Sequence, residues 1–222
     1  MSHLKEQKLW DACAGDSPVL VKDLADDPAV DVNWADPKGN QTALYNACFH
    51  GRASNAADLL KSPKIDVNKA GTEGITPFYL ACAQGHQKVV LLLLKDLRVN
   101  VNKPNHNQLS PLSYASQEGH LSVLQSILAS GRDVNTWVKS IAGPASWNDK
   151  TAVEIARAQG TRAKSADDTE EDHTRKQQNG PLIAALLDSF ERNPQQVRAQ
   201  LRKQLDFPGS IFFFLLLFLL SF

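Results

Sequence analysis

The sequence predicts an all-α fold, a helical repeat solenoid, because three features recur with one shared period. An Asp-Val-Asn or Asn-Val-Asn triplet ends at Asn33, Asn68, Asn102 and Asn135. An Ala-Cys or Ala-Ser pair begins at Ala12, Ala47, Ala81 and Ala115. A glycine follows the last three pairs, at Gly51, Gly85 and Gly119. Successive members of each series are 33 to 35 positions apart, which indicates one small supersecondary unit stacked several times.

Each unit is predicted to contain two helices, as the stretch from residue 76 illustrates. Thr76 can accept hydrogen bonds from the free N–H groups of a helix that begins at Pro77. The small pair Ala81-Cys82 allows a neighbouring helix to approach closely, and Gly85 ends the helix. The apolar run 87–94 then forms a second helix. A short extended loop, here called a finger, connects each unit to the next.

The neighbouring units repeat this design. Equivalent helix starts are Thr42 and Ser110, and the eighth and ninth residues after each glycine are apolar. Those residues are Leu59-Leu60, Leu93-Leu94 and Ile127-Leu128. We therefore expect a repeat domain over residues 1–205, with units at about 4–35, 36–70, 71–104, 105–137 and 148–190.

The two end units depart from the pattern. The first lacks a Thr-Pro start and carries several polar residues, as expected for a terminal cap that faces water. The fifth starts at Thr151 but loses register after Gly160. Residues 161–179 are polar and have no apolar periodicity, which predicts a mobile insert before the outer helix resumes. A C-terminal helix is predicted over 193–205, after the cap and proline Asn193-Pro194.

These motifs resemble the ankyrin repeat, a β-turn finger and two antiparallel helices with a period of about 33 residues and a T-P-L-H-x-A start. The resemblance covers roughly residues 5–160 and is expected to continue through Leu187. The fourth motif position carries Tyr45, Tyr79 and Ser113 instead of His, so the usual His-to-turn hydrogen bond must be replaced or lost. His86 and His120 hold the Gly-His position, where the family uses histidine to tie neighbouring loops together. We interpret both as structural residues.

The cysteines argue against an enzyme and for a reducing compartment. Cys13, Cys48 and Cys82 occupy the same place in successive units, where cysteine acts as a small buried hydrophobe. Their odd count and the lack of an N-terminal apolar signal segment favour the cytoplasm, with the nucleus as an alternative. No phosphate-binding glycine loop or metal-spaced His/Cys set is present, so no cofactor or metal is expected. The 24 basic and 24 acidic residues balance, which argues against nucleic acid.

Residues 206–222 form an apolar tail. As a helix, 211–222 would span about 18 Å against roughly 30 Å of hydrocarbon, which is too short to cross a membrane alone. It is an interfacial anchor, the start of a longer span, or sequence from an incorrectly placed gene end. The predicted helix 193–205 correspondingly either packs on the fifth unit or lies, with its basic residues, beside a membrane.

The resemblance implies a monomeric module or adaptor that binds another protein or peptide and performs no catalysis. The alternative is a membrane-tethered scaffold that uses helix 193–205 and the tail; an enzyme would need a catalytic centre in loops 136–150 or 161–179. Family geometry implies a concave binding surface along the fingers and inner helices. It comprises Lys38, Asn40, Phe49, His50, Thr72, Glu73, Ile75, Gln84, His106, Asn107, Leu109, Gln117 and Glu118.

The fourth finger is longer than the others. From the last asparagine of the triplet to the next helix start takes 16 residues here, against 9, 8 and 8 before it. The added segment contains Trp137 and Trp147. Two tryptophans on a lengthened loop are typical of binding anchors, although they can also fold back to cover the fifth unit.

Overall fold

The computed structural model describes residues 3–15, 17–139 and 149–205 of the 222-residue chain. These ranges contain eleven α-helices, one short 3-10 helix and a single isolated bridge between Ala35 and Thr42. The all-α repeat fold is therefore confirmed. Trp147 and the apolar tail 206–222 lie outside the described residues.

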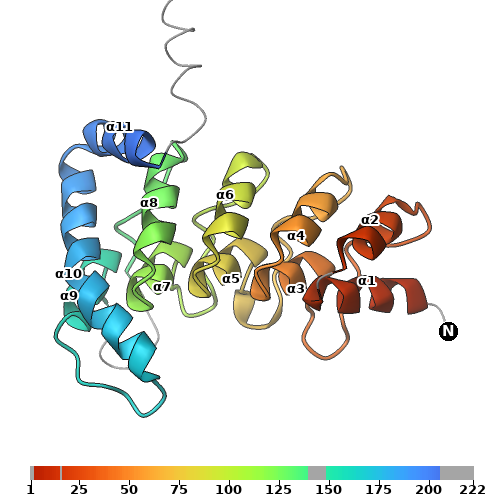
Figure 1. Cartoon of the computed structure of the whole chain (residues 1–222), viewed down its shortest axis with the longest axis horizontal. Coiled ribbons are helices and arrows are strands. Elements are labelled where there is room, and N and C mark those ends of the chain that lie inside the picture. Colours follow the sequence, from red (N-terminus) through yellow and green to blue (C-terminus); the bar gives the residue numbers. More distant parts are fainter. Residues whose placement is uncertain (1–2, 16, 140–148, 206–222) are drawn as a thin grey trace, which may run out of the picture.

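Ten of the helices form five antiparallel pairs in two layers (Figure 1). The pairs are α1 (Leu4–Ala14) with α2 (Pro18–Asp26), α3 (Ala43–Phe49) with α4 (Ala53–Leu60), α5 (Pro77–Ala83) with α6 (Gln87–Lys95), α7 (Pro111–Gln117) with α8 (Leu121–Ala129), and α9 (Ala152–Gln159) with α10 (Glu170–Arg192). The odd-numbered inner helices lie in one row and the even-numbered outer helices in the other. The 3-10 helix η1 (Thr72–Gly74) is in the second finger, and α11 (Pro194–Gln204) ends the described chain.

The inner helices begin as the sequence predicts. The side chains of Thr42, Thr76, Ser110 and Thr151 each accept a hydrogen bond from the backbone N–H three residues later. This bond satisfies one of the donors that a helix N-terminus leaves free. The three glycines that follow α3, α5 and α7 have φ between 67° and 73°, the left-handed conformation that suits a helix end.

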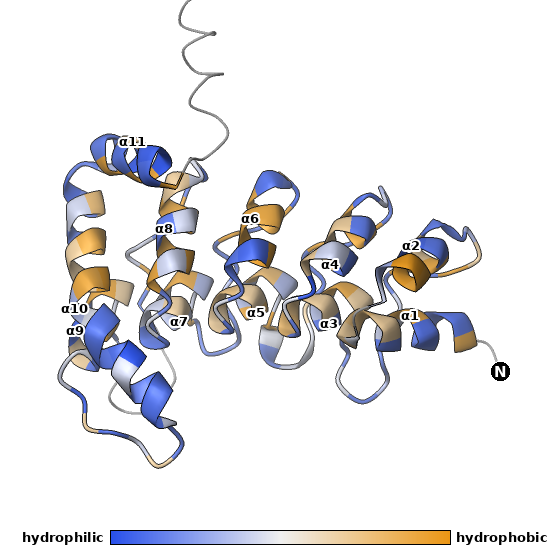
Figure 2. Ribbon diagram, in the orientation of Figure 1, coloured by the Kyte–Doolittle hydropathy of each residue, from blue (hydrophilic) through white to orange (hydrophobic). Residues whose placement is uncertain are grey.

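One continuous apolar core runs between the two layers. The Ala-Cys pairs of the inner helices are buried, and Cys13, Cys48 and Cys82 have no exposed surface. The leucines predicted on the outer helices, such as Leu59 and Leu93, are equally buried. Figure 2 shows the hydrophobic residues gathered where the helices of neighbouring pairs face one another. The core therefore extends through the stack and belongs to no single unit.

A ladder of asparagine side chains joins successive units. The amide nitrogen of Asn33 donates to the carbonyl of Lys64 at 2.8 Å, and its amide oxygen accepts from the N–H of Asp66 at 2.7 Å. Asn68 and Asn102 make the same pair of bonds to the following unit. Each of these asparagines therefore fixes the position of the next unit through its backbone.

The histidines of the Gly-His motif form a second row of links. His86 Nε2 lies 2.9 Å from the carbonyl oxygen of Phe49, and His120 Nε2 lies 3.0 Å from that of Ala83. Gln159 donates to the equivalent carbonyl of the fourth unit at 2.8 Å. The structural interpretation of both histidines is therefore supported, and glutamine takes over the link to the fifth unit.

The predicted insert 161–179 is only partly a loop. Helix α10 begins at Glu170, so residues 170–179 are helical, and the loop is confined to 161–169. Thr169 caps the helix, and the acidic first turn suits the positive end of the helix dipole. These turns are hydrophilic (Figure 2) and are held by ion pairs and hydrogen bonds. The apolar periodicity that marks an ordinary packed helix is absent for that reason.

Helix α11 packs against the stack. Its Val197 and Leu201 are buried, and it lies across the ends of α8 and α10 (Figure 1). Arg198 donates to the carbonyl of Arg132 at 3.0 Å, and Arg202 donates to that of Ala129 at 2.8 Å. Two of its basic side chains are thus used inside the protein.

We expect Gly85→Ala to destabilise the stack by at least about 1 kcal/mol, because alanine is strained at its φ of +73°. The added Cβ would also lie 2.6 Å from the His120 ring and displace its link to Ala83. Chemical denaturation measures the effect. Gly15→Ala is the control, since Gly15 has φ −79° and its nearest neighbour would lie at 3.7 Å. Equal losses in both variants would contradict the assignment.

We expect Asn68→Ala to lower the free energy of unfolding by about 1–3 kcal/mol, because two hydrogen bonds to the next unit are lost. The loss should appear as a lower midpoint in urea. Asn107→Ala is the matched control, since it removes the same amide group from a side chain that is exposed in the third finger. A variant at Asn68 that is as stable as this control would show that the ladder contributes nothing.

Candidate partner-binding surface

The finger tips are linked into one edge of the molecule. Asn40 and Glu73 have φ of 51° and 61°, which turns the chain sharply at each tip. The N–H of Thr72 donates to the carbonyl of Gly39 at 3.2 Å, and the N–H of His106 donates to that of Glu73 at 2.8 Å. The first three fingers are therefore bonded to one another as well as to their own helices.

Most residues predicted on this surface are accessible. Exposed members are Lys38, Asn40, Phe49, His50, Thr72, Glu73, Gln84, His106 and Asn107. Ile75, Gln117 and Glu118 are half-buried. The Phe49 side chain is 44% exposed, and its ring packs edge-on against that of His50, with 4.9 Å between centroids. An accessible aromatic pair thus lies at the C-terminal end of the inner helix α3.

Leu109 does not belong to the accessible surface. It is 9% exposed and packs with Ile155, Tyr114 and Ala158 in a small apolar cluster. These contacts join the third finger to the inner helices α7 and α9. The prediction that Leu109 faces a partner is corrected by this burial, because the fifth unit covers it.

Tyr79 replaces the motif histidine in the third unit. Its ring is buried, and its hydroxyl accepts a hydrogen bond from the amide of Asn105 at 3.3 Å. The amide oxygen of Asn105 in turn accepts from the N–H groups of Asn107 and Leu109. Burial raises the pKa of Tyr79 well above its ordinary value, so the hydroxyl stays protonated. The bond from helix to finger is thus replaced by a Tyr–Asn pair.

The first turns of α10 cover the inner surface beside α7. Lys176 Nζ lies 2.9 Å from a carboxylate oxygen of Glu118 and 2.8 Å from one of Asp168. Arg175 donates to the backbone carbonyl of Glu118 at 3.0 Å. Burial alone would lower the pKa of Lys176, but the two carboxylates outweigh it and raise that pKa. Glu118, predicted as a partner contact, is therefore occupied by an ion pair within the chain.

The same contacts form one wall of an open polar pocket of about 560 Å³ at this end of the surface. It is lined by Gln84, Gln117, His120 and residues from the 162–176 segment. Gln117 belongs to this pocket, and its backbone carbonyl accepts the bond from Gln159. The freely accessible part of the inner surface therefore ends near Gln84.

Trp137 is accessible, with 66% of its surface exposed. The backbone N–H of Trp137 donates to the side-chain oxygen of Asn135 at 3.0 Å, which fixes the start of the fourth finger. The relation between Trp137 and Trp147 falls outside the described residues, so the paired anchor stays a prediction.

The cysteines offer no nucleophile. Burial raises the pKa of Cys13 to about 12 and raises those of Cys48 and Cys82 as well, which keeps the thiols protonated. Across residues 3–15, 17–139 and 149–205, no group of three His, Cys, Asp or Glu side chains is placed to hold a metal ion. In the same ranges no helix is long and apolar enough to span a bilayer.

The fold and this surface define a helical repeat solenoid with linked fingers. A family model described as ankyrin repeats (3 copies) matches residues 9–103 and 55–136. The chain therefore belongs to the ankyrin repeat family. The matched region ends before α9, so the fifth pair lies beyond it. Ankyrin repeats are generally protein–protein interaction modules and generally non-catalytic. A comparison with curated proteins found no match.

The link from His120 to Ala83 should make stability depend on pH. Burial and, secondarily, Arg175 lower the pKa of His120 below its ordinary 6.5, against opposing effects of Ala83 and Glu118. The unfolded chain therefore binds a proton at higher pH than the folded one. Stability from this group is complete above pH 6.5 and is lost as the pH falls toward the lowered pKa.

His120→Gln tests this effect, because a glutamine side chain does not titrate and can donate to the Ala83 carbonyl, as Gln159 donates to the equivalent carbonyl of Gln117. We expect the melting temperature of the variant to fall less than that of the natural protein between about pH 7.5 and 5.5, a range that brackets the ordinary histidine pKa. Parallel falls in both proteins would contradict the prediction.

Proposed function

We propose that this protein is an interaction module or adaptor that binds another protein or peptide along its linked finger tips and the exposed ends of α3 and α5. The observation that carries the proposal is the row of accessible side chains on fingers bonded to one another. The partner is held by contacts alone, with no catalysis by this chain.

The proposed surface is rigid before binding. Hydrogen bonds join Gly39 to Thr72 and Glu73 to His106, and Tyr79 holds the third finger through Asn105. A surface that is already ordered loses little conformational entropy on association. The finger row therefore suits a partner that lies along several units at once.

Phe49 and Trp137 are the proposed aromatic anchors. Both are large and accessible, and aromatic residues contribute strongly to binding energy when a partner covers them. Lys38, His50, Glu73 and His106 supply polar contacts of both signs between them. Glu118 and Gln117 are left out of the contact because they serve the packing of α9 and α10. Trp147 remains a predicted second anchor of the fourth finger.

The membrane-tethered alternative has less support. It needs the basic face of α11, but Arg198 and Arg202 donate to backbone carbonyls of the stack. Liposome co-sedimentation of the chain with and without residues 211–222 tests it directly. Sedimentation that depends on those residues would favour a membrane role over a purely protein-binding one.

The test of the proposed surface begins with a partner captured by cross-linking in cell extract and then purified. We expect Phe49→Ala and Trp137→Ala together to weaken its binding more than tenfold, about 1.4 kcal/mol, with little change in melting temperature. Isothermal titration calorimetry measures the affinity.

Leu97→Ala is the matched control, because Leu97 is 83% exposed but lies directly after α6, before Asn102 and the tip of the third finger. Equal affinity in the control and the natural protein is expected. A large fall in melting temperature with unaltered affinity in the double variant would show that the two aromatic residues serve the fold and not the partner.

A further inference from the structure

The edge opposite the fingers carries its own repeated interaction. The guanidinium of Arg98 reaches back to the end of the preceding outer helix, α4. Its Nη2 donates to the carbonyl of Leu60 at 2.9 Å, and its Nη1 donates to that of Ser62 at 3.2 Å. The forked donor thus covers two carbonyls at and just after the helix end, of which that of Ser62 also accepts from the backbone N–H of Ile65 at 3.4 Å.

The next step along the stack repeats this arrangement with a different arginine. Arg132 Nη1 lies 3.4 Å from the carbonyl oxygen of Leu94 and 3.0 Å from that of Asp96. These acceptors stand eight and six residues before Asn102, as Leu60 and Ser62 stand before Asn68. At the following step, Arg202 from α11 donates to the end of α8. Three successive outer-helix ends are therefore covered by arginine.

At the first step the arginine is missing. The equivalent acceptors are the carbonyls of Ala25 and Asp27, eight and six residues before Asn33. Equivalent hydrogen bonds support this correspondence between the two units. The backbone N–H of Ala29 donates to the Asp27 carboxylate, and the backbone N–H of Arg98 donates to that of Asp96. Lys64 occupies the position that Arg98 occupies one unit later, four residues before the asparagine of the triplet. Among the residues that the structure describes, no side chain donates to the carbonyls of Ala25 and Asp27.

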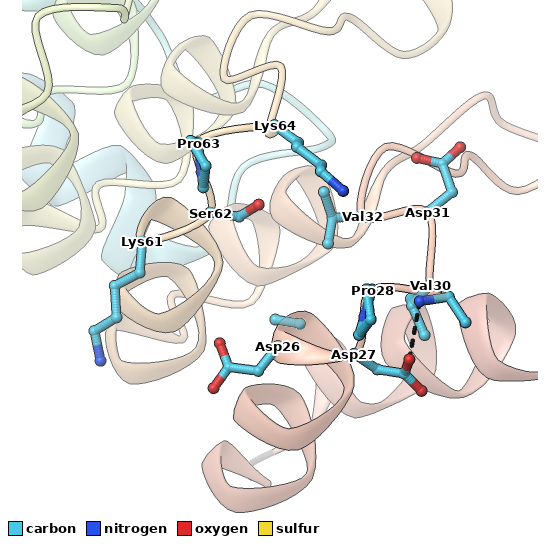
Figure 3. A pocket seen from close by; sticks show the side chains of 12 residues that line it. Asp26, Asp27, Pro28, Val30, Asp31, Val32, Lys61, Ser62, Pro63 and Lys64 are labelled. Atoms are coloured by element: carbon cyan, nitrogen blue, oxygen red, sulfur yellow. Dashed lines mark hydrogen bonds between the residues drawn. The ribbon is translucent and has the colours of Figure 1, made fainter.

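An open cavity of about 510 Å³ occupies this place (Figure 3). It is lined by residues 25–32 from the end of α2 and by 61–64 from the end of α4. In Figure 3, Lys61 and Lys64 lie on one side and Asp26 and Asp27 on the other, while the Asp31 carboxylate points outward from the rim. The space that arginine fills at the later steps is therefore present and accessible here.

The charges around the cavity favour a cation. Asp26, Asp27 and Asp31 line it, and the C-terminal end of α2 adds the negative end of a helix dipole. Lys61 is already paired with Asp58 at 2.6 Å. Asp27 is paired with Lys5, and one Asp31 oxygen accepts from the backbone N–H of Asn33 at 2.9 Å. The Asp26 side chain is exposed to an incoming group, opposite the exposed Lys64. Carbonyl and carboxylate acceptors together match the planar fork of a guanidinium better than a point charge.

We propose that the cavity between the ends of α2 and α4 binds an arginine side chain of a partner protein, in the position that Arg98 and Arg132 occupy further along the stack. This contact lies on the edge away from the fingers, so it does not depend on the proposed function of the finger surface. The partner is identified by an exposed arginine that can reach a helix end.

The test is a ¹H–¹⁵N nuclear magnetic resonance titration of the full chain with N-acetyl-arginine amide. We expect saturable shifts confined to the amides of residues 25–32 and 61–65. N-acetyl-lysine amide, with the same charge, should bind at least about fivefold more weakly because it lacks the fork, and the neutral citrulline analogue should not bind. Scattered shifts, equal binding of all three probes, or no localised shift at the highest soluble concentration would overturn the proposal.

Two substitutions at one position give the matched comparison. Lys64→Arg should place a guanidinium in the cavity from within the chain, raise the melting temperature and abolish the localised response to the arginine probe. Lys64→Gln leaves the cavity open and removes a nearby positive charge, so it should bind the probe at least as well as the natural protein. Binding that survives unchanged in Lys64→Arg would show that the carbonyls of Ala25 and Asp27 are not the site.

Discussion

The asparagine ladder is the interaction on which the rest of this structure depends. A primary amide offers a donor and an acceptor in one planar group, so a single side chain can bind both a carbonyl and an N–H of the next unit. Asn33, Asn68 and Asn102 do this in turn. With each unit placed at a fixed step, the Ala-Cys pairs meet in one core and the finger tips come within hydrogen-bonding distance of one another.

Departures from the repeat carry most of what is particular to this protein. Tyr79 replaces a histidine and still holds its finger, through Asn105. Lys64 replaces an arginine and leaves an open cavity, where the later steps are filled. A residue that recurs in every unit is explained by its packing against the equivalent residues of the neighbouring units. A position that breaks it must find another partner, within the chain or outside it.

Charge decides where the accessible inner surface ends. Lys176 is buried, and removing an ammonium group from water is costly unless opposite charges surround it. Glu118 and Asp168 supply those charges, and they fix the first turns of α10 over α7. Residues that would otherwise face a partner are thereby committed to the fold. On the inner helices the proposed contact therefore ends near Gln84, whereas along the fingers it continues through His106 to Trp137.

The sequence by itself determined the repeat, the helix starts at residues such as Thr76, the helix ends at residues such as Gly85, and the burial of the cysteines. These features are local or are repeated in every unit, so the period reveals them. Only the tertiary structure decided that Leu109 is buried against Ile155, that Lys176 forms an ion pair with Glu118, and that residues 170–179 are helical. Those contacts join residues far apart in the chain, and the polar ones leave no apolar pattern. Such a pairing becomes visible only when the fold brings its members together.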